Sequence, residues 1–302
     1  MTDPVSGPTG APPLLELDHV RKSFSSGVGR RESVVAVDDV TLALPSERPV
    51  IAAIAGESGS GKSTLGHLAL GLLSPTEGRL RFRGQTVGDL IRTDGLEFRR
   101  QVQAIFQDPA DVFNPFYRVD HVFAMLGRFR LAASAGEGRE QVRAALRAVG
   151  LDPDRTLGRY AHELSGGQAQ RLMIARVLLL KPRLIVADEP VSMVDASMRV
   201  AILDAMVELK DKLGVSILYI THDLATAYRV SDEIFILHRG RIVERGSTRA
   251  VIASPVDPYT RQLIASVPEP DPDIRWGGPP DDSPNGTPDG PGLALSQPAA
   301  VR

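Results

Sequence analysis

Most of the chain alternates short apolar runs with helical patterns. Val50–Ala55, Leu184–Ala187 and Ile217–Ile220 are continuous apolar runs, which indicate strands buried on both faces of a parallel sheet. Apolar residues recur at helical spacing over Lys62–Leu73 and Ala196–Leu213. This alternation predicts an α/β domain with parallel strands at its centre.

Other segments depart from that alternation. Leu14–Val20 and Val34–Leu44 have strand-like patterns, and Ser25–Glu32 between them reads as a loop tip. From about residue 90 the chain is rich in Arg and Ala and helical in pattern, with a break at Gly136–Gly138. We therefore predict a helical subdomain over about residues 90–180.

The carboxyl-terminal third adds a hairpin and then changes composition. Ile234–Leu237 and Arg241–Glu244 predict two strands around an Arg-Gly turn. The principal domain is predicted to span residues 14–253, followed by an extension over 254–272. Residues 273–302 are rich in Pro, Gly, Asp and Ser, and we expect this tail to be disordered.

At the other end, residues 1–13 are polar, contain four prolines and are also expected to be disordered. They lack the layout of a signal peptide, and no apolar run approaches the ~18–20 residues that span a bilayer. We therefore expect a soluble, intracellular protein that acts at a membrane only through a partner.

Composition narrows the function classes. The chain has 35 Lys and Arg against 37 Asp and Glu, a net charge of −2, which argues against a nucleic-acid binder. There is no cysteine, so disulfides, zinc–cysteine sites and cysteine-bound iron–sulfur clusters are excluded.

A glycine-rich loop follows the first buried strand. Residues 56–64 read G-E-S-G-S-G-K-S-T, which fits the phosphate-binding pattern G-x-x-x-x-G-K-[ST] between a strand and a helix. We expect Lys62 to reach the β- and γ-phosphates of a nucleotide and the Ser63 hydroxyl to bind Mg²⁺. The predicted nucleotide-binding residues of this loop are Gly56, Ser58, Gly59, Ser60, Gly61, Lys62, Ser63 and Thr64.

A carboxylate pair follows the second buried strand. Leu184–Ala187 runs directly into Asp188 and Glu189. Asp188 is predicted to hold the same Mg²⁺ through water, and Glu189 to act as general base toward the water that attacks the phosphate. An isolated Asp-Glu pair would more simply be a solvated strand end, but its position downstream of the glycine-rich loop favours a site.

Between these two motifs, Leu164–Gln168 reads Leu-Ser-Gly-Gly-Gln. With the three motifs in this order, the chain resembles a nucleotide-binding subunit of an ATP-binding cassette (ABC) transporter over about Leu14–Pro270. The resemblance implies a P-loop NTPase fold of the α/β class. Its parts are a mainly parallel RecA-like core sheet, an antiparallel β subdomain and a helical subdomain that carries the signature motif. It also implies ATP and Mg²⁺ as cofactors.

The resemblance assigns further residues. Gln107 matches the glutamine that senses Mg²⁺ and the γ-phosphate and touches the membrane subunits, and His222 matches the switch histidine that contacts the γ-phosphate. Phe24 lies where the family places an aromatic ring against adenine, although a Phe at a strand end is a core residue about as often. The implied catalytic residues are Glu189, His222 and Gln107. The implied Mg²⁺ residues are Ser63, Gln107 and Asp188.

The signature segment implies a dimer. Its serine and glycines precede a helix over Ala169–Leu180, whose N-terminus offers donors and a positive dipole to an anion. In the family that anion is the γ-phosphate held by the other subunit, so two chains arranged head to tail enclose two ATP molecules. The residues implied to act in trans are Ser165, Gly166, Gly167, Gln168 and, in the segment Ser192–Asp195, Asp195.

A narrower resemblance points to the oligopeptide/dipeptide importers, whose pattern is matched by Phe106–Pro109 and Pro258–Thr260. Asp257 stands where that family usually has His, and Ala169 where Arg is common. The resemblance implies peptide cargo, with oligosaccharides or nickel as alternatives. It also implies two transmembrane permease subunits and an extracytoplasmic substrate-binding protein that acts indirectly. A second ATPase subunit is implied, a paralogue in preference to an identical copy, at the cytoplasmic side of the inner membrane.

Two alternatives stay open at this point. A soluble ABC ATPase acting on nucleic acid or ribosomes usually has two cassettes, a coiled-coil insertion or zinc-binding cysteines. An exporter cassette is usually fused to membrane spans. One cassette, no sustained heptads and no cysteine favour the importer.

Overall fold

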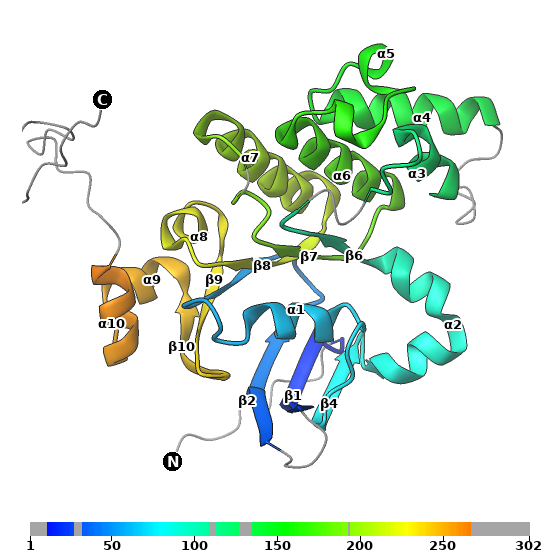
Figure 1. Ribbon diagram of the computed structural model, residues 1–302. Helices are drawn as coiled ribbons and strands as arrows, with labels where there is room; N and C mark the ends of the chain where they lie inside the picture. Colours follow the sequence, from blue (N-terminus) through cyan, green and yellow to red (C-terminus); the bar gives the residue numbers. More distant parts are fainter. Residues whose placement is uncertain (1–10, 27–31, 109–112, 127–134, 193, 267–302) are drawn as a thin grey trace, which may run out of the picture. The chain divides into compact units, whose positions relative to one another are not determined.

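The structure is a computed structural model, shown in Figure 1. It describes residues 11–26, 32–108, 113–126, 135–192 and 194–266. Several predictions fall outside these residues, namely most of the N-terminal segment 1–13, part of the Ser25–Glu32 loop tip, Pro109, Met193 and the tail 273–302.

The core sheet has six described strands in the order β10-β9-β3-β8-β7-β6. They are β3 Ile51–Ala55, β6 Val102–Ile105, β7 Leu184–Asp188, β8 Ser216–Thr221, β9 Glu233–His238 and β10 Arg241–Ser247. The strands β9, β3, β8, β7 and β6 pair in parallel, and of the six described strands only β10 runs antiparallel to its neighbour, β9. Every residue of β3 and β8 is buried, as expected for central strands covered on both faces. The prediction of a mainly parallel core sheet is confirmed.

A second sheet is antiparallel, in the order β2-β1-β4-β5. Its strands are β1 Leu15–Ser26, β2 Glu32–Leu44, β4 Glu77–Phe82 and β5 Gln85–Thr86. The predicted loop tip Ser25–Glu32 was too long at both ends, because Ser25 and Ser26 of β1 pair with Ser33 and Glu32 of β2. These polar residues form backbone ladder bonds without the apolar alternation that marks a half-buried strand.

Helix α1, Lys62–Ala69, lies between the two sheets (Figure 1). Leu65 and Leu68 are buried in a cluster that joins apolar residues of both sheets. Burial of one such side chain stabilises the fold by roughly 1.5–3 kcal/mol. The helix ends four residues before the predicted Leu73, because Gly71 adopts a left-handed conformation (φ +66°).

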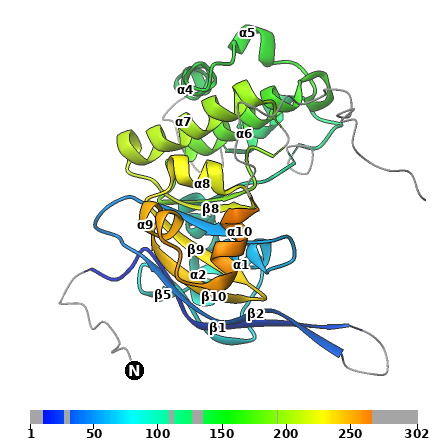
Figure 2. The same ribbon diagram turned by 90° about the vertical axis from the view of Figure 1, so that its left-hand side faces the viewer.

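The other face of the core sheet is covered by α6, Gly166–Leu180, and α7, Ala196–Leu213, with α8, Leu224–Val230, beside them (Figures 1 and 2). Their apolar faces form a second cluster with residues of β3, β7 and β8. No helix in the described part of the chain is long and apolar enough to cross a membrane.

The remaining helices lie partly within about residues 90–180, where the sequence predicts a helical subdomain, and partly after β10; the extent of that subdomain stays a prediction. They are α2 Val87–Gln101, α3 Val119–Leu126, α4 Ala135–Ala148, α5 Pro153–Thr156, a 3₁₀ turn Ala161–Glu163, α9 Thr248–Ala253 and α10 Pro258–Ala265. The predicted break at Gly136–Gly138 is wrong, since both glycines lie in the first turn of α4. Glycine costs up to ~1 kcal/mol in a helix, and burial of Leu146 on the same helix offsets part of that cost.

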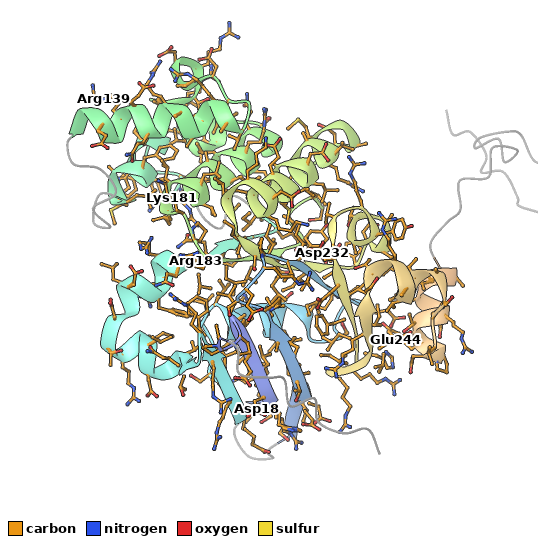
Figure 3. The ribbon with its side chains drawn as sticks, turned by 180° about the vertical axis from the view of Figure 1, so that it is seen from behind. Asp18, Arg139, Lys181, Arg183, Asp232 and Glu244 are labelled. Carbon is orange, nitrogen blue, oxygen red and sulfur yellow. The ribbon has the colours of Figure 1, made fainter. Side chains whose placement is uncertain are left out.

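Asp232 ties these layers together (Figure 3). Its carboxylate accepts a hydrogen bond from the Ile51 backbone N–H (2.8 Å) and pairs with Lys210 Nζ of α7 (3.1 Å). The start of β3 is thereby fixed to the segment before β9 and to the covering helix α7.

Candidate functional site

A cavity of about 680 Å³ lies at the carboxyl end of the parallel strands. It is formed by the loops that follow β3, β6, β7 and β8, together with one residue each from β2 and α10. Ligands of open α/β sheets bind at this edge. The lining residues are Ala36, Gly56, Glu57, Ser58, Gly59, Gly61, Lys62, Ser63, Thr64, Gln107, Glu189, His222 and Leu263.

The glycine-rich loop packs tightly against two strands. Gly61 has φ +105°, and a Cβ atom there would lie 2.1 Å from the carbonyl oxygen of Ala36 on β2. A Cβ at Gly56 would lie 2.1 Å from the carbonyl oxygen of Leu237 on β9. Only glycine fits these two positions, so the loop backbone itself can approach a ligand closely.

Lys62 is almost fully buried, with 6% of its surface exposed. Its ammonium donates to the carbonyl oxygens of Gly56 (2.8 Å) and Glu57 (2.7 Å). Burial lowers the pKa of Lys62, and the carboxylates of Glu189 and Asp188 oppose that effect. An ammonium has three donors, so one remains to bind a phosphate oxygen in the cavity.

Asp188, the last residue of β7, is half-buried. Burial raises the pKa of its carboxyl group, the hydrogen bond with the Ser63 hydroxyl opposes the rise, and the neighbouring charge of Glu189 adds to it. No group of three or more His, Asp or Glu in the described ranges forms a metal cage. Mg²⁺ at phosphate sites is held instead by one or two protein oxygens, water and the phosphates. The Asp188 carboxylate and the Ser63 hydroxyl, which are hydrogen-bonded to each other, supply two such oxygens, and Gln107 lies on the cavity lining.

Glu189 and His222 are brought together from two strands. His222 Nδ1 lies 2.8 Å from Glu189 Oε1, and the Glu189 backbone N–H donates to the Ile220 carbonyl oxygen (2.9 Å). Glu189 adopts a left-handed conformation (φ +46°), which costs energy for a residue other than glycine and is common at functional sites. Both side chains line the cavity, so a hydrogen-bonded carboxylate is available to a water molecule there.

The signature segment begins α6. The Ser165 hydroxyl accepts from the Gln168 N–H (3.2 Å), and Gln168 Oε1 accepts from the Ser165 N–H (2.9 Å). This reciprocal cap starts the helix at Gly166, three residues before the predicted start. Ser165 and Gly166 are exposed, and among the described residues that line the cavity none belongs to this segment.

Four other predicted residues lie apart from the cavity lining given for the described chain, and one of them is Asp188, which reaches the lining through its hydrogen bond with Ser63. Asp195 caps α7 and accepts from the Met198 N–H (2.9 Å). The buried Ser60 hydroxyl has no hydrogen-bond partner among the described groups. Phe24 lies on β1, is 41% exposed and has Lys22 Nζ 5.2 Å from its ring centroid. The adenine contact of Phe24 stays a prediction.

Sequence reasoning missed three residues of the cavity lining, namely Ala36, Glu57 and Leu263. Leu263 of α10 lines the cavity, and the Tyr259 hydroxyl on the same helix accepts from the Glu57 N–H of the glycine-rich loop (3.0 Å). The four-residue spacing of Tyr259 and Leu263 is typical of one face of a helix, but nothing in the sequence indicates what that face packs against.

A glycine-rich loop before α1, a lysine inside it and a carboxylate pair at the end of β7 define a P-loop nucleoside triphosphatase. The family model described as ABC transporter matches residues 37–192. A second model, described as oligopeptide/dipeptide transporter, C-terminal region, matches residues 243–290. The chain belongs to the ABC transporter ATP-binding family and is an ABC-type ATPase.

Curated relatives agree with the family. The chain is 36% identical over 269 residues to the oligopeptide transport ATP-binding protein OppF of Salmonella typhimurium, covering 87% of this chain and 80% of OppF. It is 37% identical over 260 residues to OppF of Streptococcus mutans, covering 86% and 83%.

Solved structures agree with the fold. The ATP-binding cassette MJ0796, in a dimeric post-hydrolysis state bound to ADP and Pi, has 28% identity and a TM-score of 0.69, covering 78% of this chain and 99% of that one. The protein cbiO1 of Clostridium perfringens, part of the ABC transporter complex cbiONQ, has 27% identity and a TM-score of 0.68, covering 80% and 92%.

Proposed function

We propose that this chain is the ATP-hydrolysing subunit of an importer of the oligopeptide/dipeptide type, with peptides as cargo and oligosaccharides as the alternative. The observation that carries this proposal is the match of residues 243–290 to the C-terminal region of that transporter family. The described part of this region includes α10, which contacts the glycine-rich loop. OppF of two bacteria is a relative over most of the chain.

In this proposal the cavity binds ATP. The loop amides and Lys62 hold the phosphates, and Ser63, Asp188 and Gln107 hold Mg²⁺. When bound, the metal ion neutralises charge on the β- and γ-phosphates. Glu189 takes a proton from the attacking water, and His222 orients the Glu189 carboxylate through their 2.8 Å hydrogen bond.

We further propose that two cassettes close head to tail over two nucleotides. The signature segment does not contribute to the lining given for its own chain's cavity, and Ser165 and Gly166 are exposed at the N-terminus of α6. A capped helix N-terminus with a positive dipole suits a phosphate presented by a second chain. The second chain is a paralogous subunit in preference to an identical copy.

The permease is proposed to dock on the helical subdomain beyond Gln107. Phe116 and Tyr117 are 85% and 51% exposed there, beside a small cavity of about 210 Å³. Arg176 lines the same cavity, where burial lowers its pKa and its Nε lacks a hydrogen-bond partner among the described groups. A hollow lined by both apolar side chains and the cations of Arg118 and Arg176 suits a helix that carries an acidic side chain. The chain would then act at the cytoplasmic side of the inner membrane, and a substrate-binding protein would act on it only through the permease.

Reconstitution tests the proposal. The tagged chain is purified with the membrane proteins that bind it, incorporated in vesicles and assayed for ATP-dependent uptake of peptides and of oligosaccharides. Peptide uptake that needs both ATP and the binding protein is expected. Uptake of oligosaccharides alone would reassign the cargo, and recovery of the chain without any permease would contradict the importer role.

A further inference from the structure

One peptide group of the glycine-rich loop is held from both sides. The N–H of the Gly56–Glu57 peptide donates to the Tyr259 hydroxyl (3.0 Å). The C=O of the same peptide accepts from Lys62 Nζ (2.8 Å). Tyr259, the peptide and Lys62 therefore form three hydrogen-bonded groups in series, and hydrogen bonds in series polarise and strengthen one another.

The helix that carries Tyr259 is itself firmly anchored. The Asp257 side chain caps it by accepting from the Tyr259 N–H (2.8 Å), and Pro258 occupies its first turn. The Glu244 carboxylate of β10 accepts from the N–H groups of Val256 (2.8 Å) and Asp257 (3.0 Å). Burial alone would raise the pKa of Glu244, but hydrogen bonds such as these hold it below its usual value. Figure 3 places Glu244 beside this segment.

The face of α10 toward the loop is well packed. The Tyr259 ring lies against the His238 ring, with centroids 3.9 Å apart. Leu263 lies one turn further along the same face and lines the cavity, with 8% of its surface exposed. The hydroxyl of Tyr259 is thus fixed in position by contacts that do not involve the hydroxyl itself.

We propose that Tyr259 is a positioning residue of the nucleotide site. Its hydroxyl fixes the plane of the Gly56–Glu57 peptide, and the carbonyl of that peptide directs the Lys62 ammonium toward the phosphates. Helix α10 thereby links the carboxyl-terminal region to the affinity for ATP. This inference rests on the proposed use of the cavity as the ATP site.

Tyr259→Phe removes the hydroxyl and keeps the ring against His238. We expect the full chain to bind MgATP roughly 2- to 10-fold more weakly, as the loss of one hydrogen bond predicts. In the assembled transporter the KM for ATP rises by a similar factor while kcat stays close to the parent value. Tyr228→Phe removes a tyrosine hydroxyl from α8, away from the cavity lining, and serves as the matched control with parental affinity.

The same Tyr259→Phe substitution, made in a Lys62→Ala chain, distinguishes a positioning role of Tyr259 from a packing role. If Tyr259 acts through Lys62, Tyr259→Phe changes the residual affinity of a Lys62→Ala chain less than twofold. The same factor in both backgrounds, or a Tyr259→Phe chain with parental affinity or lost folding, would overturn the proposal. A parent chain that binds no ATP would instead contradict the assignment of the cavity, so the two failures are distinguishable.

Discussion

Replacement of Glu189 by glutamine tests the hydrolytic role most directly. Glutamine keeps the size of the side chain, and its amide can replace the carboxylate in the 2.8 Å hydrogen bond to His222 Nδ1 as acceptor or donor. Burial is the main cause of the raised pKa of Asp188, and the negative charge of Glu189 raises that pKa further. The variant loses this charge. Asp188 is therefore at least as ionised in the variant, and binding of MgATP is expected to persist.

The loss in rate follows from the missing proton acceptor. One positioned general base contributes about 10²–10⁴ to the rate of a reaction. At about 1.36 kcal/mol for each factor of ten, the barrier to hydrolysis rises by ~3–5 kcal/mol. With ATP bound and not hydrolysed, two cassettes are expected to stay closed through Ser165 of each chain.

Three measurements on the full transporter check this. Phosphate release measures hydrolysis, calorimetry measures ATP affinity, and size-exclusion chromatography with and without ATP measures association of the cassettes. Glu208→Gln is the matched control, because Glu208 lies on the surface of α7 and pairs with Lys212 at 3.1 Å. A Glu189→Gln protein that releases phosphate at nearly the parental rate would remove Glu189 from the mechanism.

Three further changes test other parts of the site. Gln107→Ala is expected to retain ATP binding and to reduce transport more than hydrolysis in vesicles; unchanged transport would contradict the coupling role. Gly61→Ala puts a Cβ 2.1 Å from the Ala36 carbonyl oxygen and should abolish ATP binding, whereas Gly88→Ala on α2 meets no atom within 4 Å. Gly88→Ala should bind ATP normally in the same titration, and its free energy of unfolding should rise by up to ~1 kcal/mol. Because folding raises the pKa of Asp188, its ionisation costs stability as pH rises through that pKa. Asp188→Asn should therefore raise the thermal midpoint of the nucleotide-free chain at pH 8, and calorimetry should show the gain fading toward the ordinary pKa of aspartate, about 4; a gain that does not change with pH would refute this.

The sequence predicted the centre of the fold because its signals are local. Continuous apolar runs located β3, β7 and β8, and a glycine-rich loop directly after β3 located the cavity. Glu189 followed from its place directly after the apolar run of β7, and His222 from the resemblance to the ABC family.

What the sequence did not predict depends on tertiary contacts. The packing of α10 on the glycine-rich loop joins Tyr259 to Glu57, 202 positions away. The helical glycines of α4 and the paired serines at the end of β1 follow packing and backbone pairing that override local propensity. Phe24 matched a family position, yet nothing in its neighbours along the chain specifies what its ring will meet.

The reciprocal cap at Ser165 and Gln168 has a kinetic consequence. The side chain of each residue accepts a hydrogen bond from the backbone N–H of the other. The signature segment is therefore already ordered before a second chain binds. Little conformational entropy then remains to be lost on association, so encounter of the cassettes should be limited by diffusion and by nucleotide occupancy. The signature segment of a free chain would then be preformed for association. The lifetime of the closed dimer would be set by how long the γ-phosphate remains bound.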